Sequence, residues 1–474
     1  MSAEDRTQSD ARQFASGARI LSIGIASTGL FTFVYLALAS NLLTPADYSR
    51  VSICWAIMYV ILCVIYRPVE QLLSRTIADR YARGDHKASV LRVPAIIQAS
   101  FALLFLAVTL ALHHRIVSGL FKGSEELFWI LVVGVLAYAA SYFARGWLAG
   151  NKSFALYGGL VFLESTSRCL FAAVAAIAVG TNLGPVAIGM AVAPFASLVV
   201  IPFAFKRVAG NRSLRPVPRE EGSVEWADAG LEGPGAEGTE EAATDLSLRH
   251  GSGFAAAVVA IMASEQALMN AGVLIVALSS GGGDITNGLA GFVFNVLLIV
   301  RAPLQLFQAL QTSILPHLTS MEAEGSADEF HKAVRLTVLV IGGFAVAVAV
   351  GLVAIGPFVM SHLLASRHSG AVVYHYDRFG LAAVGLGMGL HLAAGTLNQA
   401  LLARGRSFQA AASWLTAAVV FVAFVAAPTL HSMVWRVEAG YLIATALLAT
   451  LLWVHYRRSA SPARSRRRAT LVTS

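Results

Sequence analysis

The sequence predicts an all-α integral membrane protein of about twelve transmembrane helices. Of its 474 residues, 57% are hydrophobic and 13% are charged, and the mean hydropathy is +0.67, a composition that soluble globular enzymes do not have. Apolar stretches of about 20 residues, the length that crosses a bilayer as a helix, recur along the whole chain. Lys and Arg concentrate in alternate connecting segments, as they do in polytopic membrane proteins.

The apolar stretches divide the chain into spans and connecting segments. The twelve predicted spans are 18–40, 51–72, 91–112, 127–148, 156–179, 184–205, 254–280, 288–311, 336–361, 379–402, 408–427 and 434–455.

The distribution of positive charge predicts the orientation of these spans. With the N-terminus inside, most cations fall on the cytoplasmic side, including those of residues 75–87 and the arginines of the tail 457–474. Both termini are therefore predicted to be cytoplasmic. The polar start, Met1–Arg12, lacks the apolar core of a secretory signal, so the first span itself is expected to direct insertion. The net charge of +8 is explained by topology and contact with anionic lipid, and no nucleic-acid partner is expected.

A long polar segment separates the first six spans from the last six. Nine acidic residues lie between Glu220 and Asp245 without a cation among them, in a stretch that also contains prolines and glycines. This composition predicts a flexible linker that is too polar to form a packed domain. The predicted divisions are an N-terminal tail (1–17), a first lobe (18–206), the acidic linker (207–252), a second lobe (253–456) and a basic tail (457–474).

The two lobes resemble each other in sequence. The turn after the fourth span, Leu148–Phe154, and the turn after the tenth, Leu402–Phe408, have identical or similar residues at five of seven positions. Arg67 of the second span and Arg301 of the eighth are each followed four residues later by a glutamine. Transporters built from such repeats place their substrate site where the repeats meet. We therefore expect two six-helix lobes around a central cavity that opens alternately to each side of the membrane.

The eighth span carries a polar stripe that marks this cavity. Arg301, Gln305, Gln308 and Thr312 follow one another at spacings of 4, 3 and 4, which places them on one face of a helix. An arginine at membrane depth is costly unless it faces protein or a watery cavity, so its presence predicts a functional site. Arg67 is predicted to lie across the same cavity, with snorkelling of its guanidinium to lipid headgroups as the alternative.

Other ionisable side chains fall inside predicted spans. Glu164 and Arg168 lie four residues apart in the fifth span and share a helix face, either as a structural ion pair or as part of a cationic lumen. Glu265 and Asn270 lie near the midpoint of the seventh span. A buried carboxylate can take up and release a proton, so Glu265 is the first candidate for ion coupling, with Glu164 and Glu70 as further candidates. The alternative for Glu265 is a role as counter-ion to the arginine of the eighth span.

The sequence predicts neither a metal centre nor an enzyme active site. Cys54, Cys63 and Cys169 all fall inside spans, where thiols act as small packing residues, and no zinc-ligand spacing is present. The chain has no phosphate-binding glycine loop, no paired His–Glu metal motif and no nucleophile elbow. We expect no cofactor and no catalytic residue; an integral-membrane glycosyl or acyl transferase is the weaker alternative.

Several connecting segments resemble those of one transporter family. Leu42–Tyr48 after the first span, Leu315–Thr319 after the eighth, and the paired turns Leu148–Phe154 and Leu402–Phe408 are similar to polysaccharide-export flippases. These are the lipid-linked oligosaccharide translocases of the multidrug/oligosaccharidyl-lipid/polysaccharide (MOP) superfamily. The resemblance covers roughly residues 15–455, although Ser49 stands where glycine is expected and the acidic linker is longer than usual.

The resemblance implies a multi-pass protein of the bacterial cell membrane that moves a polyprenyl-diphosphate-linked oligosaccharide to the outer leaflet. Glycan polymerases and glycosyltransferases of the same pathway are its expected partners. Guanidinium groups suit this cargo because they stay charged and donate a planar fork of hydrogen bonds to a diphosphate. The expected substrate-binding residues are Arg67, Arg168, Arg301, Gln305, Gln308 and Asn270. The alternatives are an ion-coupled exporter of drugs or small cations from the same superfamily, and a scaffold that recruits partners through its acidic linker.

Overall fold

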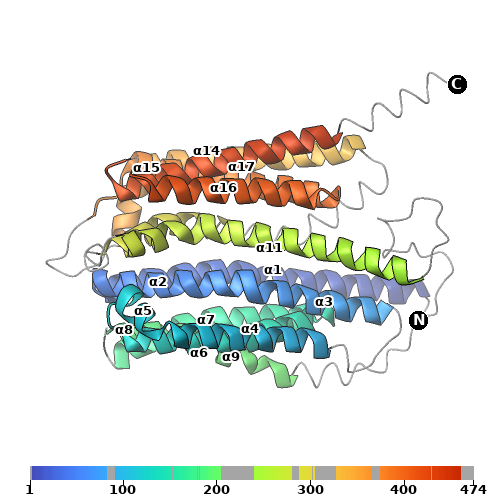
Figure 1. The fold of residues 1–474 in the computed structure, drawn as a ribbon, viewed down its shortest axis with the longest axis horizontal. Coiled ribbons are helices and arrows are strands. Elements are labelled where there is room, and N and C mark those ends of the chain that lie inside the picture. Colours follow the sequence, from blue (N-terminus) through green and yellow to red (C-terminus); the bar gives the residue numbers. More distant parts are fainter. Residues whose placement is uncertain are drawn as a thin grey trace.

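The computed structural model describes residues 3–82, 91–151, 153–178, 180, 182–203, 240–279, 288–301, 303–304, 327–364, 374–428 and 430–460. Within these residues every regular element is a helix. Figure 1 shows the helices running along one long axis, with the first half of the chain (blue to green) on one side and α14–α17 (orange to red) on the other. Helix α11 lies between them.

The described helices fall into two halves of the chain. The first half contains α1 (Ala3–Leu42), α2 (Pro45–Ile61), a π-helical turn (Leu62–Tyr66), α3 (Arg67–Ala82), α4 (Arg92–Ala111), α5 (His113–Arg115), a second π-helical turn (Ile116–Leu120), α6 (Glu125–Gly150), α7 (Phe154–Ala178), α8 (Leu183–Ala187) and α9 (Gly189–Leu198). The second half contains α11 (Glu240–Ser279), the Leu289–Arg301 helix, α14 (Ala327–Leu363), α15 (Arg378–Ala403), α16 (Ser407–Ala426) and α17 (Met433–Ala460).

Eleven helices in the described part of the chain are long and apolar enough to cross a membrane. Each of them overlaps a predicted span, and the Leu289–Arg301 helix is the described portion of the remaining one. The prediction of an all-α, multi-pass membrane protein is therefore confirmed. Helix α1 begins and α17 ends at the same end of the bundle (Figure 1), which we call the termini end. The opposite end, where α1 ends and α15 begins, is called the distal end.

Each half is held together by its own helix pairs. In the first half α1 packs against α7, α3 against α6, and α7 against α9. In the second half α14 packs against α15, α15 against α17, and α11 against α16. The main helix contact across the halves joins α2 to α11. The arrangement gives the two lobes that the internal repeat predicts.

Local sequence explains where several helices begin. Thr44 precedes α2, and its hydroxyl accepts a hydrogen bond from the amide of Asp47 at 3.2 Å, while Pro45 occupies the first helical position. Asp377 caps α15 in the same way by accepting from the amide of Gly380 at 2.8 Å. These caps satisfy amide donors that the first helical turn leaves without an intrahelical partner.

The second span contains a π-helical turn next to a predicted site residue. Residues Pro45–Ile77 form one continuous span, and the turn Leu62–Tyr66 interrupts its α-helical hydrogen bonding directly before Arg67. Such single turns insert one residue into a helix and frequently occur at functional sites. The turn changes the face on which Arg67 emerges relative to the side chains of α2.

Three helix ends differ from the predicted boundaries. Helix α1 begins at Ala3, within the predicted tail 1–17, and α17 continues to Ala460. Helix α11 begins at Glu240, so residues 240–252 of the predicted flexible linker are helical. Its first residues, Glu-Glu-Ala-Ala, are good helix formers, and acidic groups at a helix N-terminus interact favourably with the helix dipole. Linker residues 207–239 lie outside the described residues.

The two paired turns of the repeat differ in detail. After α6 the amide of Ser153 donates to the carbonyl of Leu148 at 2.9 Å. After α15 the amide of Arg406 donates to the carbonyl of Leu401 at 2.9 Å, one position earlier in the alignment of the two turns. Gly405 takes a φ of +67°, a conformation that glycine adopts without strain, whereas the aligned Asn151 has a φ of −86°. Both turns therefore contain a bond to the carbonyl five residues earlier, but at shifted positions.

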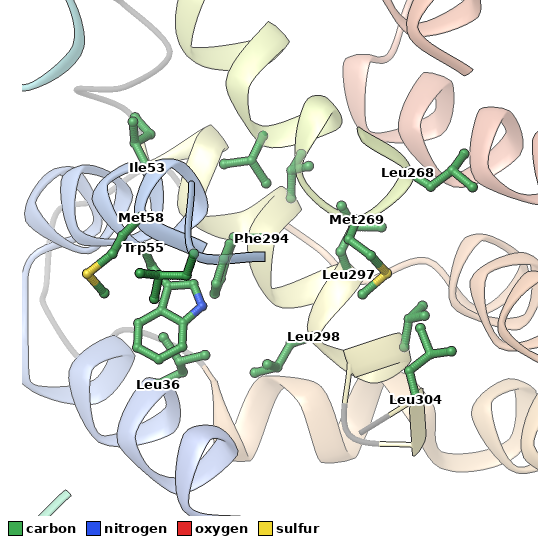
Figure 2. Close-up of a cluster of buried hydrophobic side chains, with 14 of the residues drawn as sticks. Leu36, Ile53, Trp55, Met58, Leu268, Met269, Phe294, Leu297, Leu298 and Leu304 are labelled. Carbon is green, nitrogen blue, oxygen red and sulfur yellow. The ribbon is translucent and has the colours of Figure 1, made fainter. Parts of the chain in front are cut away.

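A shared apolar core joins the halves around the centre of the bundle. Figure 2 shows part of it: Leu36 and Trp55 come from α1 and α2, and Met269, Phe294 and Leu297 come from the second half. All five side chains belong to one buried cluster. Polar groups placed beside this core are shielded from water by both halves.

Candidate functional site

A small polar cavity lies where the two halves meet. It measures about 30 Å³, room for one or two water molecules. Its walls come from α1, α2, α11 and the segment that begins with the Leu289–Arg301 helix: Thr32, Trp55, Tyr59, Glu265, Gln266, Met269, Arg301 and Leu304. Arg301 is the twelfth residue after Leu289, about 18 Å along the helix from the distal end, which places the cavity near the middle of the membrane.

Arg301 is buried in this cavity wall and binds neutral acceptors. One η nitrogen donates to the carbonyl of Met269 at 3.0 Å and to Oδ1 of Asn270 at 2.6 Å, and the guanidinium carbon lies 4.5 Å from the centre of the Phe294 ring. Its Nε has no partner among the described residues. Glu265, whose alternative role was that of counter-ion to Arg301, lines the same cavity, but no salt bridge joins the two among the described residues. The positive charge of Arg301 is thus held in place without a carboxylate in the described part of the chain.

Asn270 orients the guanidinium from behind. It is fully buried, and its Nδ2 donates to Oε1 of Gln266, one turn earlier on α11, at 3.0 Å. This bond occupies the amide nitrogen and leaves Oδ1 to accept from Arg301. Asn270 lies outside the cavity wall, whereas Gln266 is part of it. In this conformation Asn270, an expected substrate-binding residue, contacts Arg301 and not the cavity.

The first half pairs its buried arginines with a carboxylate. Glu164 binds Arg145 at 2.5 Å and Arg168 at 3.5 Å, and it also accepts from the hydroxyl of Ser141 at 3.1 Å. Arg168 donates in addition to the hydroxyl of Tyr138 at 2.7 Å. The predicted Glu164–Arg168 pair is present, and a second arginine joins it. Because the three charged groups are buried together, each depends on the others for charge compensation.

Arg168 contacts the central cavity through an aromatic side chain. Its guanidinium carbon lies 4.8 Å from the ring centre of Trp55, and Trp55 stacks on Tyr59 with ring centres 6.1 Å apart. Arg168 also donates to the hydroxyl of Thr32 at 3.4 Å. Trp55, Tyr59 and Thr32 line the cavity, so Arg168 lies one layer behind its wall.

Arg67 and Glu70 link this charged network to the second half. Glu70 is buried and accepts from the hydroxyl of Tyr157 at 2.6 Å. Arg67 interacts electrostatically with Glu265 of α11 as well as with Glu70 of its own helix. The predicted arrangement, with Arg67 and Arg301 in the wall of one cavity, is only partly present, because Arg301 lines the cavity and Arg67 does not.

Asn295 joins the two halves near the distal end. Its Oδ1 accepts a short hydrogen bond from the hydroxyl of Tyr48 of α2. Its Nδ2 donates to the carbonyl of Leu364 at 3.3 Å and to the hydroxyl of Tyr376 at 3.4 Å. Ser40 of α1 donates to the same carbonyl at 2.6 Å. One buried amide thus connects three separate segments.

A close helix contact completes this closure. The amide of Gly291 donates to the hydroxyl of Ser49 at 2.9 Å across the two halves. A Cβ atom at position 291 would lie 2.7 Å from the Tyr48 ring and 3.1 Å from the Ser49 hydroxyl, so only glycine allows this approach. We call Tyr48, Ser49, Gly291, Asn295 and Leu364 together the distal seal. Its hydrogen bonds join the two halves on the distal side of the central cavity.

Some predicted residues lie outside the described chain, and others were missed. Gln305, Gln308 and Thr312 belong to residues 305–326, which the structure does not describe. Arg145 was missed, although an arginine near the end of a predicted span, one turn after a tyrosine, was a usable signal. Trp55 was also missed, because aromatic residues in a span are usually packing residues.

Comparison with known proteins identifies structures but no sequence family. No family model matches the sequence. No curated protein matches it either.

Three solved structures are similar over nearly their full length. The first is an inward-facing multidrug resistance MATE family transporter of the MOP superfamily, with a TM-score of 0.68 at 13% identity, covering 94% of this chain and 99% of that one. The second is the Vibrio cholerae MATE transporter VcmN in its bent form, with a TM-score of 0.56 at 14% identity, covering 95% and 98%. The third is a MOP superfamily transporter from Pyrococcus furiosus, with a TM-score of 0.60 at 15% identity, covering 94% and 95%.

These likenesses establish the architecture of the chain. At 13–15% identity they speak for the fold alone. The protein has the two-lobed, twelve-helix fold of MATE transporters of the MOP superfamily.

Proposed function

We propose that this protein is a flippase that moves a polyprenyl-diphosphate-linked oligosaccharide from the inner to the outer leaflet of the cytoplasmic membrane. Transport proceeds by alternating access of the cavity between the two halves. The termini end faces the cytoplasm in this proposal, as the distribution of Lys and Arg predicts. The product serves the synthesis of a cell-envelope polysaccharide, for which glycosyltransferases supply the substrate and a polymerase consumes it.

One observation carries the proposal: Arg301 is buried in the cavity wall and has neutral hydrogen-bond partners in the described chain. A buried cation without a counter-ion is unfavourable. An anionic ligand in the cavity relieves that cost, and a guanidinium can hold a phosphate oxygen pair through its planar fork. A site built this way favours diphosphate over a cationic drug.

The distal seal supports an order of events. With Tyr48, Asn295 and Leu364 bonded together, the cavity is closed on the side that the charge distribution assigns to the outside. Substrate binding at Arg301 comes first, and opening of the distal seal follows.

Other residues in and around the cavity wall are proposed to contact the substrate, to support Arg301 and Trp55, and to couple transport to an ion. Arg67 and the glutamines at 305 and 308 are proposed as further substrate contacts when the cavity widens, since the present 30 Å³ does not hold a sugar diphosphate. Arg168 supports Trp55, and Asn270 supports Arg301. Glu265 is the proposed ion-coupling group because it lines the cavity and lies within electrostatic reach of Arg67. Glu164 and Glu70 come second as coupling groups, because neither lines the cavity.

An ion-coupled exporter of drugs or small cations is the second candidate. The carboxylate of Glu265 in the cavity wall favours it, as does the likeness to a multidrug resistance transporter. The fold does not decide between the two, since the Pyrococcus furiosus structure is described as having a binding pocket of reversed polarity that suggests a different function. The choice between flippase and exporter therefore depends on the charges of the residues around the cavity.

A deletion strain separates the two candidates. The flippase predicts loss of surface polysaccharide together with accumulation of its lipid-linked precursor in the inner leaflet, both restored by the wild-type gene. Sensitivity to cationic drugs with normal surface polysaccharide would overturn the proposal in favour of the exporter.

A further inference from the structure

An apolar groove lies on the first half of the chain, outside the wall of the central cavity. It measures about 440 Å³ and is bounded by α4, α6 and the end of the sixth span. Its lining residues are Leu91, Ala95, Gln98, Ala99, Ala102, Ala139, Ala140, Phe143, Ala144, Trp147 and Ile201. Ten of the eleven are apolar, so the groove suits neither a diphosphate nor a sugar.

The groove opens sideways and not into the central cavity. Helix α4 packs mainly against α3 and α6, and neither it nor α6 contributes to the cavity wall. Ala95, Ala99 and Ala140 are exposed, and most of α4 is unburied. Because the surrounding helices cross the membrane, the medium at this opening is lipid hydrocarbon.

Small residues on both helices create the hollow. Ala95, Ala99 and Ala102 recur at helical spacing on α4 and face the alanines of α6. Such faces usually let helices approach closely, yet here a large space remains, and Phe143 and Trp147 form part of its walls. Gln98 fixes α4 to α6 at this separation by donating to the carbonyl of Ala139 at 2.8 Å. An unfilled apolar space of this size forfeits the dispersion contacts of its lining.

The length of the groove matches one leaflet. Its lining on this side runs from Leu91 to Ala102, a stretch of twelve residues whose ends lie about 16 Å apart along a helix. Leu91 precedes the first turn of α4 at the termini end, so the groove extends from the membrane surface to about half of a hydrocarbon core of roughly 30 Å. An acyl chain of the leaflet on the termini side fills this distance.

A positively charged residue, Arg92, is next in sequence to the lining residue at the end of the groove. Arg92 is exposed and follows Leu91 directly, and Trp147 lies in the groove wall near the same end of α6. Tryptophan and arginine are typical of the headgroup level of a membrane, and the cytoplasmic leaflet carries the anionic lipids. We propose that this groove, lined by α4 and α6 and entered beside Arg92, binds one acyl chain of an anionic phospholipid of the leaflet on the termini side.

Photolabelling of the full-length protein tests the site. The protein is reconstituted in phosphatidylcholine vesicles that contain a trace of phosphatidylglycerol with a diazirine on its acyl chain. We expect adducts on α4 and α6 peptides around Ala99 and Ala140, competed by unlabelled phosphatidylglycerol more strongly than by added phosphatidylcholine. Ala99→Trp should lower this labelling about tenfold. The tryptophan fills part of the groove, and an acyl chain that can no longer bury two of its methylenes there binds about tenfold more weakly.

A matched variant controls for the substitution itself. Ala107 is exposed on the same helix but outside the groove, so Ala107→Trp should label like the wild type. If Ala99→Trp does not accumulate, Ala140→Phe fills the opposite wall and serves the same purpose. Arg92→Gln should keep the acyl adducts and lose the preference for phosphatidylglycerol. Equal labelling of wild-type and groove-filled protein, or adducts spread evenly over the exposed helices, would overturn the site whatever the transported substrate is.

Discussion

The two halves of the molecule bury their arginines in different ways. In the first half Arg145 and Arg168 share the carboxylate of Glu164, so the charges compensate one another. In the second half Arg301 is bound by a carbonyl and an amide oxygen, both neutral. A compensated cluster fixes helix packing, whereas an oriented cation beside a cavity is available for a ligand. In the proposed function, the charged cluster of the first half therefore serves stability and Arg301 of the second half serves recognition.

The largest effect is expected from removing the carboxylate of the first half. Glu164→Leu leaves Arg145 and Arg168 buried without their counter-ion, which costs about 3–5 kcal/mol in comparable sites. We expect the protein to accumulate poorly and to unfold at a much lower temperature in detergent. Adding Arg145→Met and Arg168→Met to the same chain should restore most of the thermal stability. The exposed Glu125 is the control, and Glu125→Leu should change the unfolding temperature little.

The distal seal gives the next largest effect. Gly291→Leu cannot fit against the Tyr48 ring, so it should hold the distal end open and stop export without unfolding the protein. Reaction of Ser52→Cys with a membrane-impermeant maleimide, in a chain without the three native cysteines, measures this opening. Gly351→Leu, at a glycine with free space around it, should leave labelling and export unchanged. Slow labelling in the Gly291→Leu protein would show that this contact does not close the distal end.

A smaller effect is expected when the second half is made to resemble the first. Asn270→Asp replaces the neutral acceptor of Arg301 by a carboxylate of nearly the same shape. The protein should be at least as stable as the wild type, since the buried charge gains a counter-ion. Affinity for polyprenyl diphosphate should fall about tenfold, because a close opposite charge competes with the ligand. Unchanged affinity in an equilibrium binding assay would mean that Arg301 does not meet the diphosphate.

The fold could be predicted from the sequence because hydrophobic length and charge distribution are local signals. All eleven described spans overlap predicted ones. Helix ends were less predictable. Glu240 begins a helix inside a segment whose overall composition is polar, because a few good helix formers are enough to favour a helix locally.

The site could be predicted only in part. The sequence singles out Arg301, Glu265 and the Glu164–Arg168 pair because charges inside spans are rare and four-residue spacings define a helix face; the structure places the first two in the cavity wall and shows the pair. The partners of Arg301, and the seal formed by Asn295, depend on contacts between residues distant in sequence. The π-helical turn before Arg67 changes the direction of that side chain, which spacing alone does not reveal.

Binding of polyprenyl diphosphate to purified Arg301 variants tests the central claim most directly. Arg436 is the matched control, since it also donates to backbone carbonyls but lies near the distal end, outside the cavity wall. We predict that Arg301→Met weakens binding about ten- to hundredfold, the effect of losing a charge-assisted hydrogen bond of about 1.5–3 kcal/mol. Arg301→Lys should recover part of the lost affinity, because lysine keeps the positive charge but lacks the planar pair of guanidinium donors. Arg436→Met should bind like the wild type. Wild-type binding by Arg301→Met, together with full export by the double variant Arg301→Met, Glu265→Met, would contradict the account.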